Sequence, residues 1–143
     1  MSIFRTRRKV EWADADVAGI IFYPRYFEML NSVIDEWFEV ELGASFAGLI
    51  SDHNVGSPMG EVQTRFSGAC MLGDVIEFEL EVAQISDRTV TLDVASKVDG
   101  ALKIRTRATH ICARRDISKA AHWPLHVREK LSRHSIGGRT AHA

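Results

Sequence analysis

The chain has 143 residues, 45% hydrophobic and 26% charged, which fits one folded domain and excludes a disordered or low-complexity protein. Its 18 Lys and Arg against 19 Asp and Glu leave a net charge of −1, which argues against a nucleic-acid partner bound through bulk positive charge. The sequence has no apolar run long enough to span a membrane and no secretory signal, and Cys70 and Cys112 lack disulfide or CxxC spacing. These features predict a cytoplasmic protein without a membrane partner.

The N-terminal third predicts a strand followed by a long helix. Residues 3–12 alternate in polarity as a strand does, although Arg8 interrupts the alternation. After the turn-rich segment 13–19, residues from Pro24 to the stop at Gly43 have the period of a helix. One arc of about 180° holds its apolar side chains: Tyr26, Phe27, Met29, Leu30, Val33, Ile34, Trp37 and Phe38. This arc is wider than the apolar stripe of an ordinary surface helix, so we expect other elements to cover half of the helix circumference.

The remainder predicts antiparallel strands. Residues 43–57 are loop-like, with room for one short helical turn, and period-two alternation then marks strands at 62–66, 76–82, 90–94 and 102–112. Short turns at 86–88 and at Asp99-Gly100 join the last three strands. This order predicts an α+β domain with the hot-dog architecture, an antiparallel sheet wrapped around one long helix. We expect this domain to span residues 1–126, with the end of a C-terminal helix and a flexible tail at 127–143.

The segment before the long helix holds the candidate chemistry. Asp14, Asp16 and Gly19 lie between the first strand and the helix, where turn formation alone would explain them. The apolar run Ile20-Ile21-Phe22-Tyr23 follows directly and must turn inward, so it carries at least one carboxylate toward an apolar region. A carboxylate in such a place can act as a base or nucleophile.

Elsewhere the chemical signals are weaker. Residues 43–47 resemble a nucleophile elbow but have Ala47 where the second glycine belongs, so we interpret Ser45 as a loop or cap residue. His122 and His126 have the i, i+4 spacing of metal ligands, but Pro124 separates them and no third ligand is near. We therefore expect no metal site.

The stretch from Asp14 to Tyr26, Asp-Ala-Asp-Val-Ala-Gly-Ile-Ile-Phe-Tyr-Pro-Arg-Tyr, resembles the 4-hydroxybenzoyl-CoA thioesterase family of hot-dog acyl-CoA thioesterases. A second, weaker match runs from Val62 through Phe66 to Gly73-Asp74. The resemblance implies that Asp16 is the catalytic carboxylate, acting as nucleophile or through an activated water. It also implies that the backbone N–H of Tyr23 polarises the thioester oxygen at the start of the helix.

The resemblance further suggests substrate contacts at Gly19, Pro24, Ser57 and Arg88. Tyr23-Pro24 matches the branch that acts on aromatic acyl-CoA, whereas another branch has His at the position of Pro24. That aromatic branch binds the nucleotide of CoA through a basic cluster in a turn, of which this chain keeps only Arg88. Ser57 matches a small hydroxyl residue near the acyl pocket, although turn formation explains it equally well.

The resulting hypothesis is a cytoplasmic thioesterase for an aromatic or bulky acyl-CoA, without metal or redox cofactor, acting as a homodimer or homotetramer with sites at the subunit interface. A short-chain acyl-CoA and a carrier-protein thioester remain alternative substrates. A non-catalytic acyl-thioester-binding protein on the same fold is the main rival. A hot-dog dehydratase ranks lower, because the segment around Asp16 contains no His.

Overall fold

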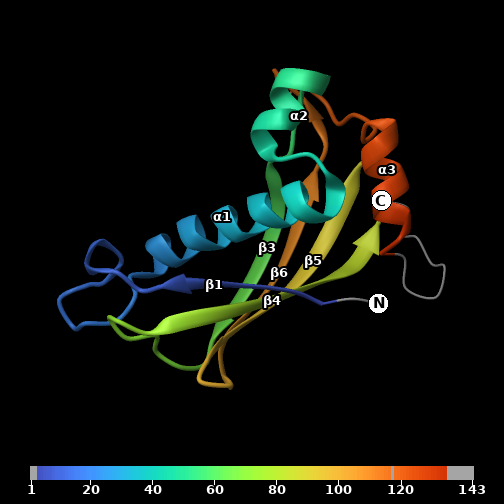
Figure 1. Ribbon diagram of the computed structural model, residues 1–143. Helices are drawn as coiled ribbons and strands as arrows, with labels where there is room; N and C mark the ends of the chain where they lie inside the picture. The colour runs from blue at the N-terminus through green and yellow to red at the C-terminus, as the bar shows by residue number, and fades with distance from the viewer. Residues whose placement is uncertain (1–2, 117, 135–143) are drawn as a thin grey trace.

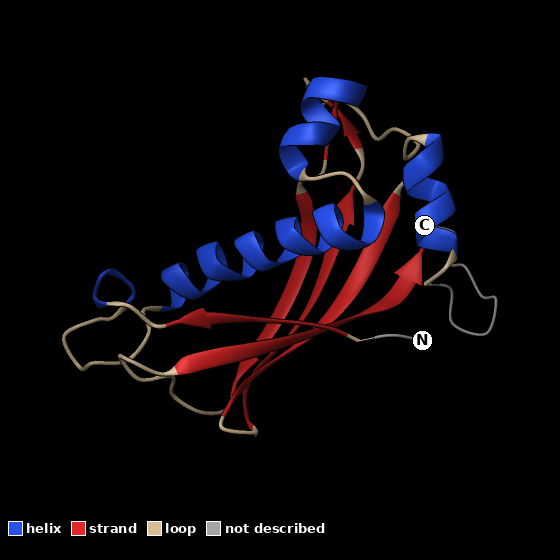
Figure 2. Cartoon of the chain, in the orientation of Figure 1, coloured by secondary structure: helices blue, strands red, loops and turns tan. Residues whose placement is uncertain are grey.

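The computed structural model describes residues 3–116 and 118–134, and it places one long helix against a five-stranded antiparallel sheet (Figure 1). The sheet has the order β1-β4-β5-β6-β3, with strands β1 (Phe4–Lys9), β3 (Met59–Phe66), β4 (Val75–Ile85), β5 (Thr89–Val98) and β6 (Ala101–Ile111). Two short strands, β2 (Val55–Gly56) and β7 (Ala113–Arg114), pair separately. The helices are α1 (Tyr23–Leu42), α2 (Phe46–His53) and α3 (Leu125–Ser132) (Figure 2). The predicted hot-dog architecture is confirmed.

Helix α1 supplies the centre of the core. Its buried side chains include six of the predicted apolar arc, Tyr26, Leu30, Val33, Ile34, Trp37 and Phe38, and also Leu42, which was not predicted. Phe27 and Met29, also predicted in that arc, are partly buried against the cluster. The helix ends at Gly43, whose φ of 68° is the left-handed conformation that glycine adopts without steric cost. The side-chain hydroxyls of Tyr26 and Ser96 lie 2.8 Å apart and join α1 to β5 inside the core.

The sheet follows the sequence alternation closely in β4, β5 and β6. Even-numbered residues of β6 from Ile104 to His110 are buried, while the residues between them are exposed or half-buried on the outer face. The predicted turn at Asp99-Gly100 joins β5 to β6 with positive φ at both residues, 49° and 81°. That combination is typical of a tight hairpin turn.

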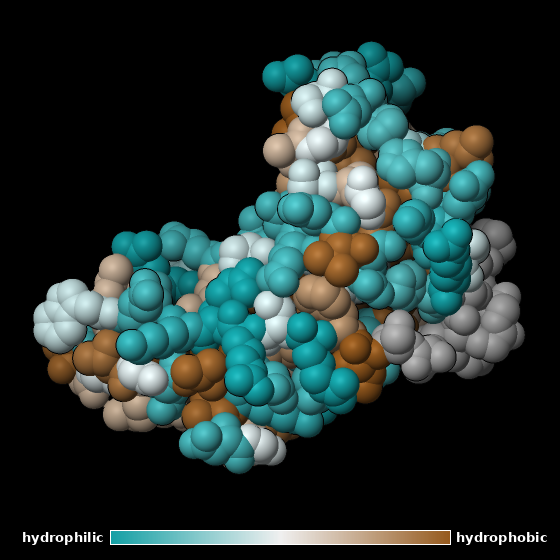
Figure 3. Space-filling view, in the orientation of Figure 1, coloured by the Kyte–Doolittle hydropathy of each residue, from teal (hydrophilic) through white to brown (hydrophobic). Residues whose placement is uncertain are grey.

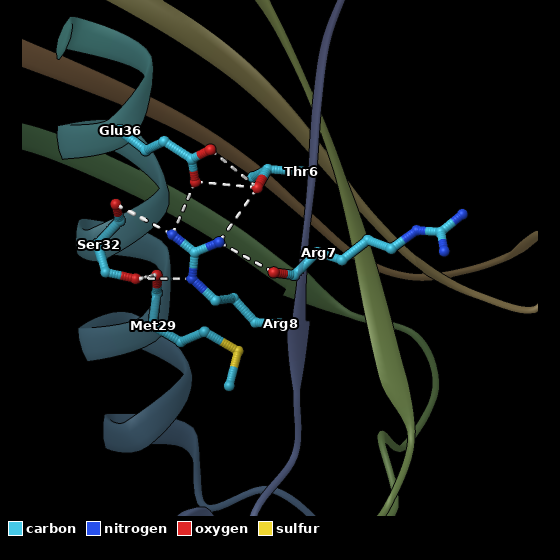
Figure 4. A network of polar contacts seen from close by, with 6 residues as sticks. All are labelled: Thr6, Arg7, Arg8, Met29, Ser32 and Glu36. Carbon is cyan, nitrogen blue, oxygen red and sulfur yellow. Dashed lines mark hydrogen bonds and ion pairs between the residues drawn. The ribbon is translucent and has the colours of Figure 1, made fainter. Parts of the chain in front are cut away.

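Arg8 breaks the predicted alternation of polarity, yet β1 continues through it, and its side chain lies on the same face of β1 as Phe4 and Thr6. Its Nη2 atom lies 2.9 Å from Glu36 Oε1 of α1, and its Nε donates to Ser32 Oγ at 3.3 Å (Figure 4). Arg8 Nη1 and the carboxylate of Glu36 both bond Thr6 Oγ1. The positive charge of Arg8 is tolerated on the face of β1 turned towards α1 because Glu36 of the helix pairs with it.

Two further predictions need correction. The first strand ends at Lys9 rather than at residue 12, and Trp12 opens a 3₁₀ turn, η1 (Trp12–Asp14), with 83% of its surface exposed. The segment 43–57 contains the full helix α2 in place of one turn. Ser45 is its N-cap and accepts a hydrogen bond from Gly48 N–H, in agreement with a cap role. With Gly48 inside and Leu49 its one buried side chain, this helix has little apolar periodicity to detect.

Helix α3 packs on the core through Val127 and Leu131, and the expected domain boundary at residue 126 falls inside it. That boundary stays a prediction, and the predicted tail at 135–143 lies outside the described residues. None of the described helices is long and apolar enough to cross a membrane.

Candidate active site

The loop between η1 and α1 positions Asp16 at one end of the sheet. Asp16 N–H donates to Ile20 O at 2.9 Å, and Gly19 N–H donates back to Asp16 O at 3.0 Å, with a φ of 75° at Gly19. Backbone bonds from Leu72 N–H to Gly19 O and from Ile21 N–H to Cys70 O, each 2.8 Å, join this turn to the loop before β4. Two loops far apart in sequence thus hold the candidate carboxylate.

The two carboxylate oxygens of Asp16 have different surroundings. Oδ1 accepts hydrogen bonds from the backbone N–H groups of Ala18 at 2.9 Å and Ile20 at 3.4 Å. Oδ2 has no hydrogen-bond partner among the described residues, and the side chain is exposed. The backbone therefore fixes the orientation of the group and leaves one oxygen available to a ligand. The neighbouring carboxylate has another role: Asp14 Oδ2 accepts from Glu11 N–H at 2.9 Å in a capping box of η1. Asp14 is not among the described residues that line the hollows beside Asp16.

Asp16 lies between two hollows. One, of about 580 Å³, is lined by Asp16, Ile20, Ile21, Phe22, Tyr23, Phe66, Gly68, Ala69, Cys70 and Ile104. The other, of about 560 Å³, is lined by Trp12, Ala15, Asp16, Val17, Gly19, Phe22 and Leu72. Apolar surface is visible at this end of the molecule, on the left of the view (Figure 3). A carboxylate with a free oxygen between apolar walls fits the chemistry predicted from the sequence.

The N-terminus of α1 borders the first of these hollows, which Phe22 and Tyr23 line. Phe22 N–H donates to Asp14 O at 2.8 Å, and Phe22 O accepts from Tyr26 N–H at 3.1 Å. The N–H of Tyr23, the first helical residue, has no acceptor within residues 3–116 and 118–134. Pro24 follows in the first turn and has no N–H of its own. The helix dipole adds partial positive charge at this point.

Ser57 and Arg88 lie at the opposite end of the sheet. Ser57 precedes Met59, the first residue of β3, whereas Phe66, the last, lines the Asp16 cavity; the strand between them spans about 23 Å. Arg88 lies in the turn between β4 and β5 and contacts His122, Nη2 to Nε2, at 3.2 Å. Within one chain the structure does not bring either residue to Asp16.

Ser57 has a buried histidine beside it, but the pair does not form a nucleophilic dyad. His110 Nδ1 lies 2.9 Å from Ser57 O and 3.5 Å from Ser57 Oγ. Because a carbonyl oxygen can only accept, Nδ1 carries the proton and cannot take one from the hydroxyl. Burial lowers the pKa of His110 and keeps the ring neutral. This arrangement joins β6 to the segment before β3.

Several lining residues were not predicted from the sequence. Trp12 was predicted on a strand face, Cys70 was considered only for disulfide and CxxC spacing, and Leu72 was not singled out. Cys70 and Leu72 reach the site because the loop before β4 pairs with the loop before α1, for example in the bridge between Ile20 and Met71. The glycine and aspartate at 73–74 were the available signal, since Asp74 Oδ2 accepts from Met71 N–H at 2.7 Å and shapes that loop. No group of metal-ligating side chains occurs in the described part of the chain.

A sequence model of the thioesterase-like superfamily matches residues 10–131. The chain belongs to this superfamily. It is a thioester hydrolase by membership, and the resemblance at Asp14–Tyr26 is confirmed at the level of the family.

A curated relative is the 1,4-dihydroxy-2-naphthoyl-CoA hydrolase of Synechocystis, 24% identical over 114 residues, which are 78% of this chain and 82% of the relative. The crystal structure of a 1,4-dihydroxy-2-naphthoyl-CoA thioesterase from Synechocystis matches with a TM-score of 0.81 and 22% identity, over 91% of this chain and 96% of that one. A gentisyl-coenzyme A thioesterase matches with a TM-score of 0.75 and 24% identity, over 89% and 99%. These solved structures share the fold of this chain.

Proposed function

We propose that this thioesterase hydrolyses an aromatic or otherwise bulky acyl-CoA to the free acid and CoA, with Asp16 as nucleophile or general base. The observation that carries the proposal is the carboxylate of Asp16, which has one oxygen held by backbone N–H groups and the other without a partner among the described residues. Asp16 and Tyr23 both line the hollow of about 580 Å³, and the Tyr23 N–H also has no acceptor among the described residues. The Synechocystis hydrolase and the gentisyl-CoA thioesterase are named for CoA thioesters of aromatic acids.

The geometry supports two routes to the same products. Asp16 can attack the thioester carbonyl carbon, forming an acyl-aspartyl anhydride that water then hydrolyses, or it can take a proton from a water that attacks. In both routes the carbonyl oxygen gains negative charge, which the Tyr23 N–H and the positive end of α1 stabilise. The carbon–sulfur bond then breaks, and the CoA thiolate leaves and takes up a proton.

The hollow beside Trp12 offers space for the acyl group. Trp12 is 83% exposed, and Phe22 and Leu72 are also unusually exposed for apolar side chains. Large exposed apolar surfaces commonly mark binding sites. We assign Gly19 a role in the turn that positions Asp16. Pro24 lies in the first turn of α1 and has no N–H, so the Tyr23 N–H has no second donor at the next residue.

The proposed substrate class is tested by thiol release from benzoyl-, hydroxybenzoyl-, phenylacetyl- and straight-chain acyl-CoAs. We expect the aromatic esters to be hydrolysed with the highest kcat/KM. Preference for the straight-chain esters would contradict the acyl class while leaving the reaction intact. Saturable binding of every ester without turnover, by folded protein, would support the non-catalytic rival.

We also propose that the active assembly contains at least two copies. Strand β3 lies at the edge of the sheet, and its outer side has no neighbouring strand within the described residues. Antiparallel pairing of two β3 edges, centred on the middle of the strand, would place Ser57 opposite Gly68 of the partner subunit, which lines the Asp16 cavity. This pairing would give Ser57 the substrate contact that one chain alone does not provide.

A further inference from the structure

The outer face of the sheet, turned away from α1, carries rows of charged side chains. On most strands these charges are matched by ion pairs: Arg5–Glu79, Arg7–Glu77, Lys97–Glu79 and Arg107–Asp93. Near the β3 edge the pattern changes, because Arg65, Lys103 and Arg105 have no acidic partner among the described residues. This edge of the outer face is therefore locally basic in a chain with a net charge of −1.

The arrangement is unfavourable for the protein alone. Arg65 of β3 and Arg105 of β6 are directly opposite each other in the register, and like charges in such a pair destabilise a sheet. Lys103 precedes Arg105 by two residues and so lies on the same face. A hollow of about 480 Å³ opens beside both arginines, and its lining also includes Arg107, already paired with Asp93. A bound anion would relieve this repulsion.

Lys103 connects the basic surface with the candidate active site. Its side chain crosses Gly68 so closely that a Cβ at Gly68 would lie 2.8 Å from Lys103 Cδ and 3.5 Å from Nζ. Gly68 lines the Asp16 cavity. The backbone reinforces this contact, since Ser67 N–H and Gly68 N–H both donate to Lys103 O. A ligand held at Asp16 and leaving the cavity past Gly68 would therefore meet the ammonium group first.

We propose that Lys103, Arg105 and Arg65 bind the phosphate groups of the CoA part of the substrate. The inference rests on the proposed hydrolysis of an acyl-CoA and names the groups that recognise its nucleotide. Guanidinium groups bind phosphate oxygens through paired, charge-assisted hydrogen bonds, and a lysine adds a point charge. This surface would take over the role of the turn cluster of which the chain keeps only Arg88. The occupant is the 3′-phosphate and diphosphate of CoA, which explains why unpaired cations are kept next to the cavity.

The test compares benzoyl-CoA with S-benzoyl-pantetheine, which has the same thioester but no nucleotide. In Arg65→Gln, Lys103→Gln and Arg105→Gln we expect the KM for benzoyl-CoA to rise roughly tenfold per variant, with kcat retained. The KM for S-benzoyl-pantetheine should stay at the wild-type value. A parallel rise for both esters, or no rise for either, would overturn the proposal.

Arg7→Gln is the matched control, because Arg7 lies on the same face near the other edge and pairs with Glu77. It removes the same charge, and we expect wild-type KM values from it. Stability gives a second control: Arg65→Gln removes a like-charge pair, so its thermal midpoint should equal or exceed that of the wild type. A merely structural role for Arg65 would instead lower the midpoint.

Binding of adenosine 3′,5′-diphosphate, measured by calorimetry, keeps the inference testable without turnover. Wild-type protein should bind it, and the triple variant should bind at least tenfold more weakly. If the wild type hydrolyses neither ester but binds the nucleotide through this cluster, the proposed reaction fails and the phosphate site stands. Equal nucleotide binding by the wild type and the triple variant would overturn the site.

Discussion

The start of α1 presents a backbone donor and a side chain at one residue, Tyr23, and their roles can be separated. Its side chain is 61% exposed, while its N–H has no acceptor among the described residues.

The motif predicted the neighbourhood of Asp16 because its carboxylate, glycine and apolar run are consecutive in sequence. Which of the two carboxylates lines the hollows depends on contacts between distant loops that only the folded structure reveals.

Tyr23→Pro removes the backbone N–H together with the tyrosine ring, whereas Tyr23→Ala removes the ring alone. Proline is favoured in the first turn of a helix, and the preceding residue, Phe22, already has the extended ψ of 125° that proline requires. We expect kcat to fall by about 100-fold or more, the usual effect of losing one oxyanion donor, with the fold retained by circular dichroism. Tyr23→Ala keeps the donor and should lose far less activity. Equal losses in the two variants would show that the N–H is not the donor.

His110 should make stability depend on pH. Burial lowers its pKa below the ordinary 6.5, so the folded chain holds it neutral while the unfolded chain is protonated below about pH 6.5. The unfolded state then binds more protons, and the free energy of unfolding should fall as the pH falls from about 6.5 towards the lower pKa.

Denaturant titrations at about pH 7.5 and about pH 5.5 measure this effect. His110→Asn can still donate to Ser57 O but cannot titrate, so its free energy of unfolding should fall less between the two values. Burial also lowers the pKa of His134, which both proteins share, so the difference reports His110. An unchanged pH dependence in His110→Asn would contradict this prediction.

At the scale of elements, the chain shows which segments a single sequence can predict. Helix α1 and strands β4–β6 have long, regular apolar periods because each buries one side against the same core. Helix α2 buries Leu49 alone, and its start depends on Ser45 together with Asp35, which accepts a hydrogen bond from Phe46 N–H at 2.7 Å. That partner comes from α1, so the local sequence gives little sign of it.

The contact between β1 and α1 makes a second prediction at this scale. Arg8 and Glu36 are 29% and 36% exposed and both bond Thr6, while Arg8 also donates to Ser32. A double-mutant cycle should therefore give a coupling of about 1 kcal/mol. Arg7 and Glu77 form a longer pair of 3.5 Å, with the arginine 73% exposed, and should couple by about 0.3 kcal/mol or less. Urea titrations of the single and double alanine variants measure both values. Equal couplings would show that the Arg8 network adds nothing to an ordinary surface pair.

For the whole molecule, the separation of Ser57 and Arg88 from Asp16 is the feature that the sequence could not reveal. The resemblance placed Ser57 and Arg88 in one site with Asp16. Within a chain, both lie at the opposite end of the sheet from Asp16. Under the proposed assembly, their place in a site would depend on how copies pair, which no local pattern encodes. The β3 edge is where such an assembly can form, since its strand has an unpaired side in the described structure.

Light scattering should therefore give a mass of at least twice the 16.0 kDa of one chain. Val62, in the middle of β3, is 41% exposed, and a charge there disfavours edge pairing. We expect Val62→Lys to lower the mass and the activity together. Leu125→Lys, at a 65% exposed position on α3, is the control and should change neither. A monomeric wild type with full activity would contradict the assembly.

The central claim is that Asp16, and not its neighbour, carries the hydrolysis of a CoA thioester. The most direct measurement is the rate of thiol release from an aromatic acyl-CoA by wild type, Asp16→Asn and Asp14→Asn. Asparagine can still accept the backbone bonds that either aspartate makes, so both variants should fold. We predict that Asp16→Asn loses at least about 100-fold in kcat while Asp14→Asn keeps most of its activity. Full activity in Asp16→Asn would contradict the assignment.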